Sequence, residues 1–239
     1  MKIKEWLDVY SQLPGFVRDV VFVVLVVGGI SVFSQITLGL WTPMVAVESG
    51  SMVPNLNIGD IVVVQGASRI DIKTWEDAEA NGELAFNLPG DVILYRPYGK
   101  ERLGLADQLA HIFLRRPYPP DKATPIIHRA LRHVQEGDPM WEGGPPAPFP
   151  GYITKGDHND MIDQKAGMIV GPANETMMWG PSSFLIKVGD QTYLGEGISY
   201  LTPVKEEWVI GAARFKIPYV GYVRLLPGMI INQARDLLS

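Results

Sequence analysis

An uncharged and largely apolar stretch from Val20 to Trp41 constrains this chain more than any other part of its sequence. A helix that crosses a bilayer needs about 20 predominantly apolar residues, and this stretch is long enough. Small residues within it, such as Gly28 and Ser31, are tolerated in membrane helices, and Pro43 is a natural stop. A buried helix of a soluble protein is one alternative. A cleaved signal peptide is another, but its apolar core is usually only about 7–15 residues long. We predict one transmembrane helix over residues 20–41.

The predicted helix separates an N-terminal segment, residues 1–19, from a body of residues 42–239. Cytoplasmic segments tend to be rich in Lys and Arg, but here acidic residues offset the basic ones: Lys2, Lys4 and Arg18 against Glu5, Asp8 and Asp19. Long segments cross a membrane largely regardless of their charge. We therefore expect a single-pass protein of the cell membrane, with residues 1–19 in the cytoplasm and the body on the extracytoplasmic side.

The composition excludes several classes of function. The chain of 239 residues has no cysteine, so it has no disulfide, no thiol nucleophile and no cysteine-ligated metal. Its formal net charge of -5 gives no indication of a nucleic-acid surface, and we expect no nucleic-acid partner. Its 25 glycines and 19 prolines favour a body with many turns and strands over a helical bundle.

Two Gly-Asp pairs, each followed by an apolar run, predict strands of one sheet. Gly59-Asp60 precedes residues 61–64 and Gly90-Asp91 precedes residues 92–95, and we expect these two strands to pair. Further predicted strands cover 125–134, 151–155, 209–218 and 219–225, and a helical turn is expected near Trp75. The fold class is therefore mostly β behind one N-terminal transmembrane helix. Residues 98–124 are expected to form a surface insertion, and residues 172–202 carry no pattern that we can interpret.

A serine-rich bend follows the apolar stretch, with the sequence Ser49-Gly50-Ser51-Met52-Val53-Pro54. A bend built from small residues can expose a hydroxyl next to backbone N–H groups, as a nucleophile and its oxyanion hole require. An ordinary polar turn before a strand is the simpler interpretation of Ser-Gly-Ser alone.

A serine nucleophile needs a base, and the chain offers four histidines: His111, His128, His133 and His158. His128 lies within a predicted apolar strand, where a structural histidine is the default interpretation. Three aspartates that could orient an imidazole follow the predicted strand 151–155, namely Asp157, Asp160 and Asp163. The order Ser, His, Asp along the chain is therefore compatible with a catalytic triad.

Metal chemistry has weaker support in the sequence. Residues 157–163 resemble a calcium loop but lack its glycine and its distal glutamate. A zinc site made from His128, His133, His158 and an aspartate stays open, although the spacing matches no common motif. We expect no metal and no cofactor.

Four segments in order resemble the type I signal peptidases. The serine bend with Gly59-Asp60 is similar to the nucleophile box of that family. Ile127-His128-Arg129 resembles the box that carries a histidine in the archaeal and endoplasmic-reticulum type and a lysine in the bacterial enzymes. Lys155-Gly156-Asp157-His158-Asn159, followed by Asp163, resembles a Gly-Asp-Asn-Asn-x-x-x-Asp signature in which His158 replaces the first asparagine. Residues 211–213 and 217–221 resemble the closing strands.

The resemblance implies a signal-peptidase-like β body and a membrane-anchored serine endopeptidase. Such an enzyme removes N-terminal signal peptides from secreted preproteins after small residues, at sites of the Ala-x-Ala type. Ser51 would be the nucleophile, His128 the general base and Asp163 the orienting acid, with Asp157 supporting the site or sharing that role. The Ser49 hydroxyl and the Ser51 backbone N–H would form the oxyanion hole. The implied partners are preprotein signal peptides, the lipid bilayer and the Sec translocon.

Three other interpretations remain at this point. The self-cleaving SOS-repressor family has a related serine box, but it uses a lysine base and a DNA-binding head. A metal hydrolase would depend on the histidines and aspartates and not on Ser51. A catalytically silent, membrane-anchored β module would bind partner peptides without cutting them.

Overall fold

The computed structural model describes residues 10–104, 107, 110, 114, 116, 119, 122–166, 168–172, 183–188, 191–196 and 202–223. The chain divides into two compact units, Met1–Pro43 and Met44–Ser239. The boundary falls at the proline that follows the apolar stretch.

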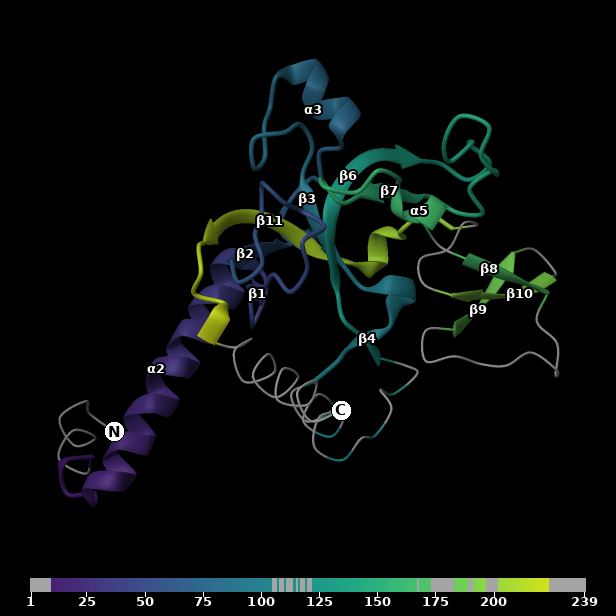
Figure 1. Ribbon diagram of the computed structural model, residues 1–239. Coiled ribbons are helices and arrows are strands. Elements are labelled where there is room, and N and C mark those ends of the chain that lie inside the picture. The colour runs from purple at the N-terminus through teal and green to yellow at the C-terminus, as the bar shows by residue number, and fades with distance from the viewer. Residues whose placement is uncertain are drawn as a thin grey trace, which may run out of the picture. The chain divides into compact units, whose positions relative to one another are not determined.

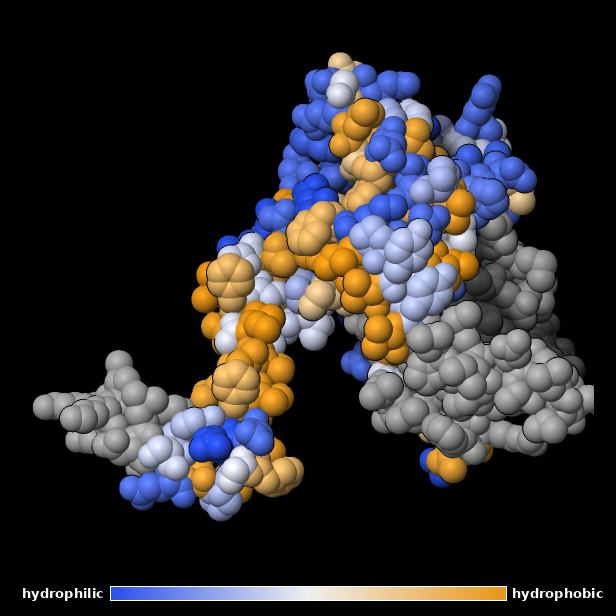
Figure 2. Space-filling view, turned by 60° about the vertical axis from the view of Figure 1, so that its left-hand side comes forward, coloured by the Kyte–Doolittle hydropathy of each residue, from blue (hydrophilic) through white to orange (hydrophobic). Residues whose placement is uncertain are grey.

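The first unit contains one long helix, α2 (Gly15–Leu38). It begins after Pro14, which has extended backbone angles, and ends at Gly39, whose φ of 73° is the left-handed conformation that favours glycine at a helix end. Apolar side chains cover its surface (Figure 2), and Ser34 is its only buried residue. The helix is long and apolar enough to span a membrane. The helix begins at Gly15, five residues before the predicted stretch, and it includes the charged residues Arg18 and Asp19. It ends before Trp41 because Gly39 adopts the left-handed conformation that terminates the helix.

The second unit is built on an antiparallel sheet of six strands (Figure 1). The strands are β1 (Met44–Ala46), β2 (Ile61–Gly66), β3 (Val92–Tyr95), β6 (Ile126–Val134), β7 (Gly151–Lys155) and β11 (Val209–Ile217). Their order across the sheet is β1-β2-β11-β3-β6-β7. The mostly β body is therefore as predicted, and β1 and β7 are the edge strands.

The prediction that β2 and β3 pair with each other is wrong, because β11 lies between them. Each Gly-Asp turn places a buried aspartate at the start of its strand, and β11 carries a cation for each of them. Lys216 lies 3.3 Å from Asp60, and Arg214 lies 3.0 Å from Asp91. Arg214 lies at a bulge of β11, between Ala213 and Phe215. Ion pairing therefore favours β11 in the central position.

The predicted strand over residues 219–225 is also wrong where the structure describes it. Residues 218–221 form a bend and a turn, and Tyr222 and Val223 are helical; Tyr219 has a φ of 64°, and its backbone N–H lies near Asp60. Pro218 lacks the N–H that would continue the β11 ladder. The sheet therefore ends at Ile217.

Two smaller elements lie in regions where the sequence was uninformative. A three-stranded antiparallel sheet, in the order β8-β10-β9, is formed by β8 (Met168–Pro172), β9 (Ser183–Val188) and β10 (Gln191–Glu196). Within the predicted insertion 98–124, β4 (Glu101–Arg102) pairs in parallel with β5 (Lys122–Ala123). His111 and much of that insertion lie outside the described residues.

The main core is formed by side chains from β3, β6, β7 and β11, and short helices pack against these strands. The short helices are α3 (Trp75–Asn81) and α5 (Asp163–Ala166). Helix α3 confirms the helical turn predicted near Trp75. Thr74 caps α3, and its hydrogen bonds lower the pKa of Asp77. The main cluster comprises Ile93, Tyr95, Ala130, Tyr152, Val204, Val209 and Ala212. Burial in this cluster raises the pKa of Tyr152 to about 12, so its phenol is neutral over the ordinary pH range.

Gly90 lies in close contact with the start of α3 and with β6. Its φ is +82°, and a Cβ added there would lie 2.6 Å from the Trp75 backbone nitrogen and 2.8 Å from the Ala130 carbonyl. Gly137 has a similar φ of +88° with no atom within 4 Å of such a Cβ. The two glycines therefore share a backbone conformation and differ in packing.

We predict that Gly90→Ala destabilises the protein more than Gly137→Ala does. The left-handed conformation costs either alanine about 1–2 kcal/mol, and crowding adds about 1–3 kcal/mol at Gly90 alone. Urea unfolding of both variants in detergent measures the difference. Equal losses for the two variants would contradict the close packing at Gly90.

Candidate active site

The bend that carries Ser51 is held by burial on either side of it. Met52 and Leu56 are fully buried, and Leu56 N–H donates to the Met52 carbonyl over 2.9 Å. The bend closes on itself because Val47 N–H donates to the Asp60 carbonyl and Gly59 N–H donates to the Val47 carbonyl. With Met52 anchored in the core, the neighbouring Ser51 stays partly exposed.

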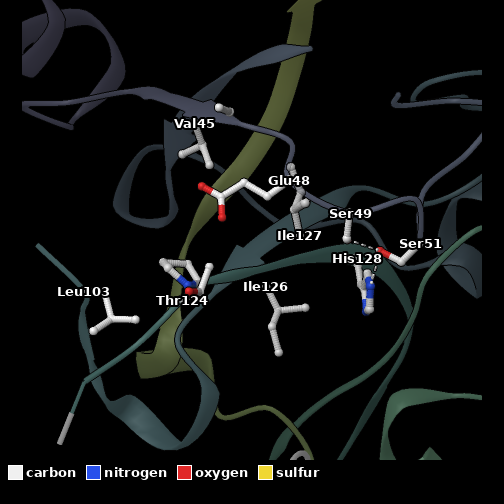
Figure 3. A pocket seen from close by; sticks show the side chains of 11 residues that line it. Val45, Glu48, Ser49, Ser51, Leu103, Thr124, Ile126, Ile127 and His128 are labelled. Atoms are coloured by element: carbon white, nitrogen blue, oxygen red, sulfur yellow. Dashed lines mark hydrogen bonds between the residues drawn. The ribbon is translucent and has the colours of Figure 1, made fainter. Parts of the chain in front are cut away.

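Ser51, His128 and Asp163 form a continuous hydrogen-bonded chain, although they come from distant parts of the sequence. The Ser51 Oγ lies 2.9 Å from His128 Nε2, and His128 Nδ1 lies 2.6 Å from Asp163 Oδ2. Figure 3 shows the Ser51 and His128 side chains turned toward each other. A carboxylate only accepts, so Nδ1 carries the proton and Nε2 presents a lone pair to the serine hydroxyl. This is the geometry that a serine nucleophile and its base require.

Asp163 Oδ2 accepts two more hydrogen bonds, which the sequence did not predict. Thr154 Oγ1 donates to it over 2.6 Å and the Tyr95 hydroxyl donates over 3.1 Å. Both donors are buried, Thr154 on β7 and Tyr95 on β3. The carboxylate is therefore fixed from three directions. No sequence motif marks Thr154 or Tyr95, because their approach depends on the order of strands in the sheet.

Ser49 lies beside the nucleophile. Its Oγ is 3.2 Å from the Ser51 Oγ, as the dashed line in Figure 3 shows, and its side chain is exposed. The Ser51 backbone N–H makes no hydrogen bond within the described residues. The two groups predicted as oxyanion donors therefore lie next to the attacking oxygen.

Asp157 is not brought to His128. Its two oxygens each accept a hydrogen bond from Arg129, Nε and Nη2, at 2.8 Å, and Asn55 Nδ2 donates over 2.8 Å. The Arg129 and Asp157 side chains are almost completely buried. Consecutive strand residues point to opposite faces, so β6 directs His128 toward Ser51 and Arg129 toward Asp157. Of the two aspartates left open by the sequence, Asp163 contacts the imidazole.

Arg129 also fastens a third segment to this cluster. Its Nη1 donates to backbone carbonyls of the 85–90 loop, at 2.6 Å for Gly90 and 2.9 Å for Ala85. The Asp157 turn touches the serine bend directly, because His158 N–H donates to the Ser51 carbonyl over 2.8 Å. Arg129 and Asp157 are therefore positioning residues for the bend and for the turn that leads to Asp163.

The other two histidines in the described part of the chain do not join the Ser51–His128–Asp163 chain. His133 pairs with Glu206 at the surface, 2.8 Å apart, and the His158 side chain is exposed. Within the described residues, no group of three or more His, Asp or Glu side chains is arranged to hold a metal ion.

A groove of about 420 Å³ runs up to Ser51 and His128. One wall comes from β1 and the serine bend, and the other comes from residues 124–128 at the start of β6, with Leu103 beside them (Figure 3). Because β1 is an edge strand, its outer backbone groups are not paired within the sheet.

Comparison with protein-family models and with curated proteins finds no match to this chain. The chemical capacity of the site therefore follows from its geometry. A partly exposed hydroxyl, an oriented imidazole, a buried carboxylate and two nearby donors are the groups that acyl transfer requires.

We predict that Arg129→Met destabilises the protein by about 3–5 kcal/mol, because it leaves the Asp157 carboxylate buried without its cation. The double variant Arg129→Met/Asp157→Leu recovers much of this loss, since it removes both buried charges. Urea unfolding of the two variants and the wild type tests the difference. A loss below about 1 kcal/mol for the single variant would mean that the ion pair does not organise this cluster.

Removing either neutral donor to Asp163 tests the second set of contacts. Tyr95→Phe and Thr154→Val keep the shape of the core and each deletes one hydrogen bond to Oδ2, so we expect a loss of about 0.5–1.5 kcal/mol each. We also expect the ¹⁵N shift of the His128 ring to change. Tyr152→Phe is the control, as Tyr152 lies in the same core and its ring packs against His133. An unchanged ring signal in both test variants would argue against the contacts.

Proposed function

We propose that this protein is a membrane-anchored serine endopeptidase that removes signal peptides from preproteins, of the archaeal and endoplasmic-reticulum type of signal peptidase I. The single observation that carries the proposal is the hydrogen-bonded chain from Ser51 through His128 to Asp163. It joins the three residues at which the sequence resembles that family. A silent peptide-binding module has no need of an oriented imidazole beside a partly exposed hydroxyl.

Ser51 Oγ attacks the carbonyl carbon of the scissile peptide bond. His128 Nε2 accepts the hydroxyl proton as the new bond forms, and Asp163 stabilises the resulting imidazolium through Nδ1. Three hydrogen bonds to Oδ2 hold the carboxylate in place, so little reorganisation is needed at that moment. A protonated imidazole cannot accept the proton, and activity therefore falls in acid.

The negative charge that develops on the carbonyl oxygen is met by Ser49 and by the Ser51 backbone N–H. In the free protein the Ser49 hydroxyl lies near the Ser51 Oγ, and it rotates to donate to the oxyanion. The tetrahedral intermediate collapses when His128 gives its proton to the leaving amine. Water, activated by the same imidazole, then hydrolyses the acyl-enzyme.

The groove accounts for the proposed substrate. An extended peptide adds to the outer edge of β1 through backbone hydrogen bonds, and the apolar walls receive small side chains near the scissile bond. The exposed apolar surface of α2 is suited to lipid. Only a short segment of chain separates Leu38 from Ser51, which keeps the nucleophile near substrates that are themselves tethered in the bilayer. The catalytic unit faces the extracytoplasmic side, where the Sec translocon delivers such substrates.

The proposal is tested by cleavage of a preprotein with an Ala-x-Ala site by the detergent-solubilised full chain. We expect Ser51→Ala and His128→Ala to lower the rate by at least about 1,000-fold and Asp163→Asn by about 100- to 10,000-fold. Asp157→Asn should act mainly through stability, so its activity should recover at low temperature. A chelator should have no effect.

Cleavage that persists in Ser51→Ala, or that a chelator abolishes in the wild type, would rule out the serine mechanism. A wild-type protein that binds the preprotein and never cuts it would instead identify a peptide-binding module.

A further inference from the structure

The segment that follows β4 supplies a leucine to the wall of the groove. Leu103 lines the groove and is only 7% exposed, and its backbone N–H donates to the Ala123 carbonyl over 3.2 Å. This hydrogen bond extends the parallel pairing of β4 with β5. Leu103 is therefore attached to the segment that continues into β6 and reaches His128.

An ion pair holds the turn that follows Leu103. The Gly104 backbone N–H donates to Asp107 Oδ2 over 2.8 Å, and Lys122 Nζ lies 3.1 Å from the same oxygen and 3.3 Å from Oδ1. The Gly104 N–H and the Lys122 ammonium both lower the pKa of Asp107, so its carboxylate is ionised at neutral pH. Asp107 thereby ties the segment that carries Leu103 to β5.

Leu103 lies at the end of the groove that is remote from the nucleophile. Figure 3 shows Leu103 and Ser51 on opposite sides of the lining residues, with Ile126 between them. Ala123, which binds the Leu103 backbone, precedes His128 by five residues, and an extended chain advances about 3.3 Å per residue. A peptide extended along this wall therefore reaches Leu103 at the fourth or fifth residue from its reacting bond.

The lining of this part of the groove favours an apolar side chain. Val45 and Pro125 line the groove together with Leu103. A large apolar side chain that packs against them leaves water, and the free energy gained rises with the apolar area that is buried. A polar side chain of similar length gains less, because it gives up hydrogen bonds to water when it enters.

We propose that Leu103 is a specificity-determining residue, which selects preproteins with a large apolar side chain at the fourth or fifth position before the scissile bond. The inference rests on the proposed peptidase function, in which the residues before the bond occupy the groove, and adds a substrate class to it. Asp107 and Lys122 are positioning residues that keep Leu103 in the wall. None of the three takes part in the chemical step.

The experiment uses the full-length protein in detergent and preproteins with leucine or glutamine at the second, fourth or fifth position before the bond. The ratio of kcat/KM for the leucine substrate to that for the glutamine substrate is compared within each protein, so that changes in overall rate cancel. The proteins are the wild type, Leu103→Ala, the milder Leu103→Val, Asp107→Asn and the control Leu84→Ala. Leu84 is exposed and does not line the groove, so the control removes the same side chain elsewhere.

We expect the wild type and Leu84→Ala to favour leucine by about tenfold or more at the fourth or fifth position and not at the second. The preference should fall to about threefold or less in Leu103→Ala and take an intermediate value in Leu103→Val. In Asp107→Asn it should weaken through KM for the leucine substrate more than through kcat.

Two outcomes would overturn the inference and leave the peptidase function standing, provided that the preproteins are still cleaved. One is a wild type without the preference, and the other is an equal preference in the wild type, Leu103→Ala and Leu103→Val. Failure of the wild type to cleave any of the preproteins would overturn the peptidase function, and the specificity with it.

Discussion

The buried guanidinium of Arg129 is the contact on which the rest of the candidate site depends. Through Asp157 it holds the turn that leads to Asp163, through Asn55 and Asp157 it reaches the serine bend, and its Nη1 secures the 85–90 loop. A buried cation tolerates few alternative arrangements, since any arrangement that leaves it unpaired costs several kcal/mol. Three loops that have no regular structure of their own are thereby kept in one geometry.

The sheet supplies the second constraint. On β6 the side chains alternate, so His128 and Arg129 lie on opposite faces of the strand. One strand therefore carries both the proposed base, His128, and the arginine that binds the surrounding loops. The neighbouring strands contribute Tyr95 and Thr154 to Asp163. Ion pairs join β11 to Asp60 before β2 and to Asp91 before β3, in keeping with its place between those two strands. The site is therefore a consequence of strand order as much as of the four sequence segments that form it.

Local patterns were sufficient for most strands and insufficient where tertiary contacts decided the outcome. The apolar runs of β2, β3, β6 and β7 were predicted because burial imposes a visible pattern on the sequence. The small sheet of β8, β9 and β10 was missed because its segments show little periodicity. The strand expected after Pro218 fails because Tyr219 adopts a left-handed conformation, which no apolar pattern reveals.

The sequence by itself determined the long apolar helix, the mostly β body and the serine, histidine and aspartate that were candidates for one site. It could not choose between Asp157 and Asp163, since both follow the same strand a few residues apart. Only the tertiary structure decided that Asp163 meets His128 while Asp157 meets Arg129. The physical reason is that hydrogen bonds between distant segments depend on strand order and on which face each side chain occupies. Short spacing along the chain does not encode either one.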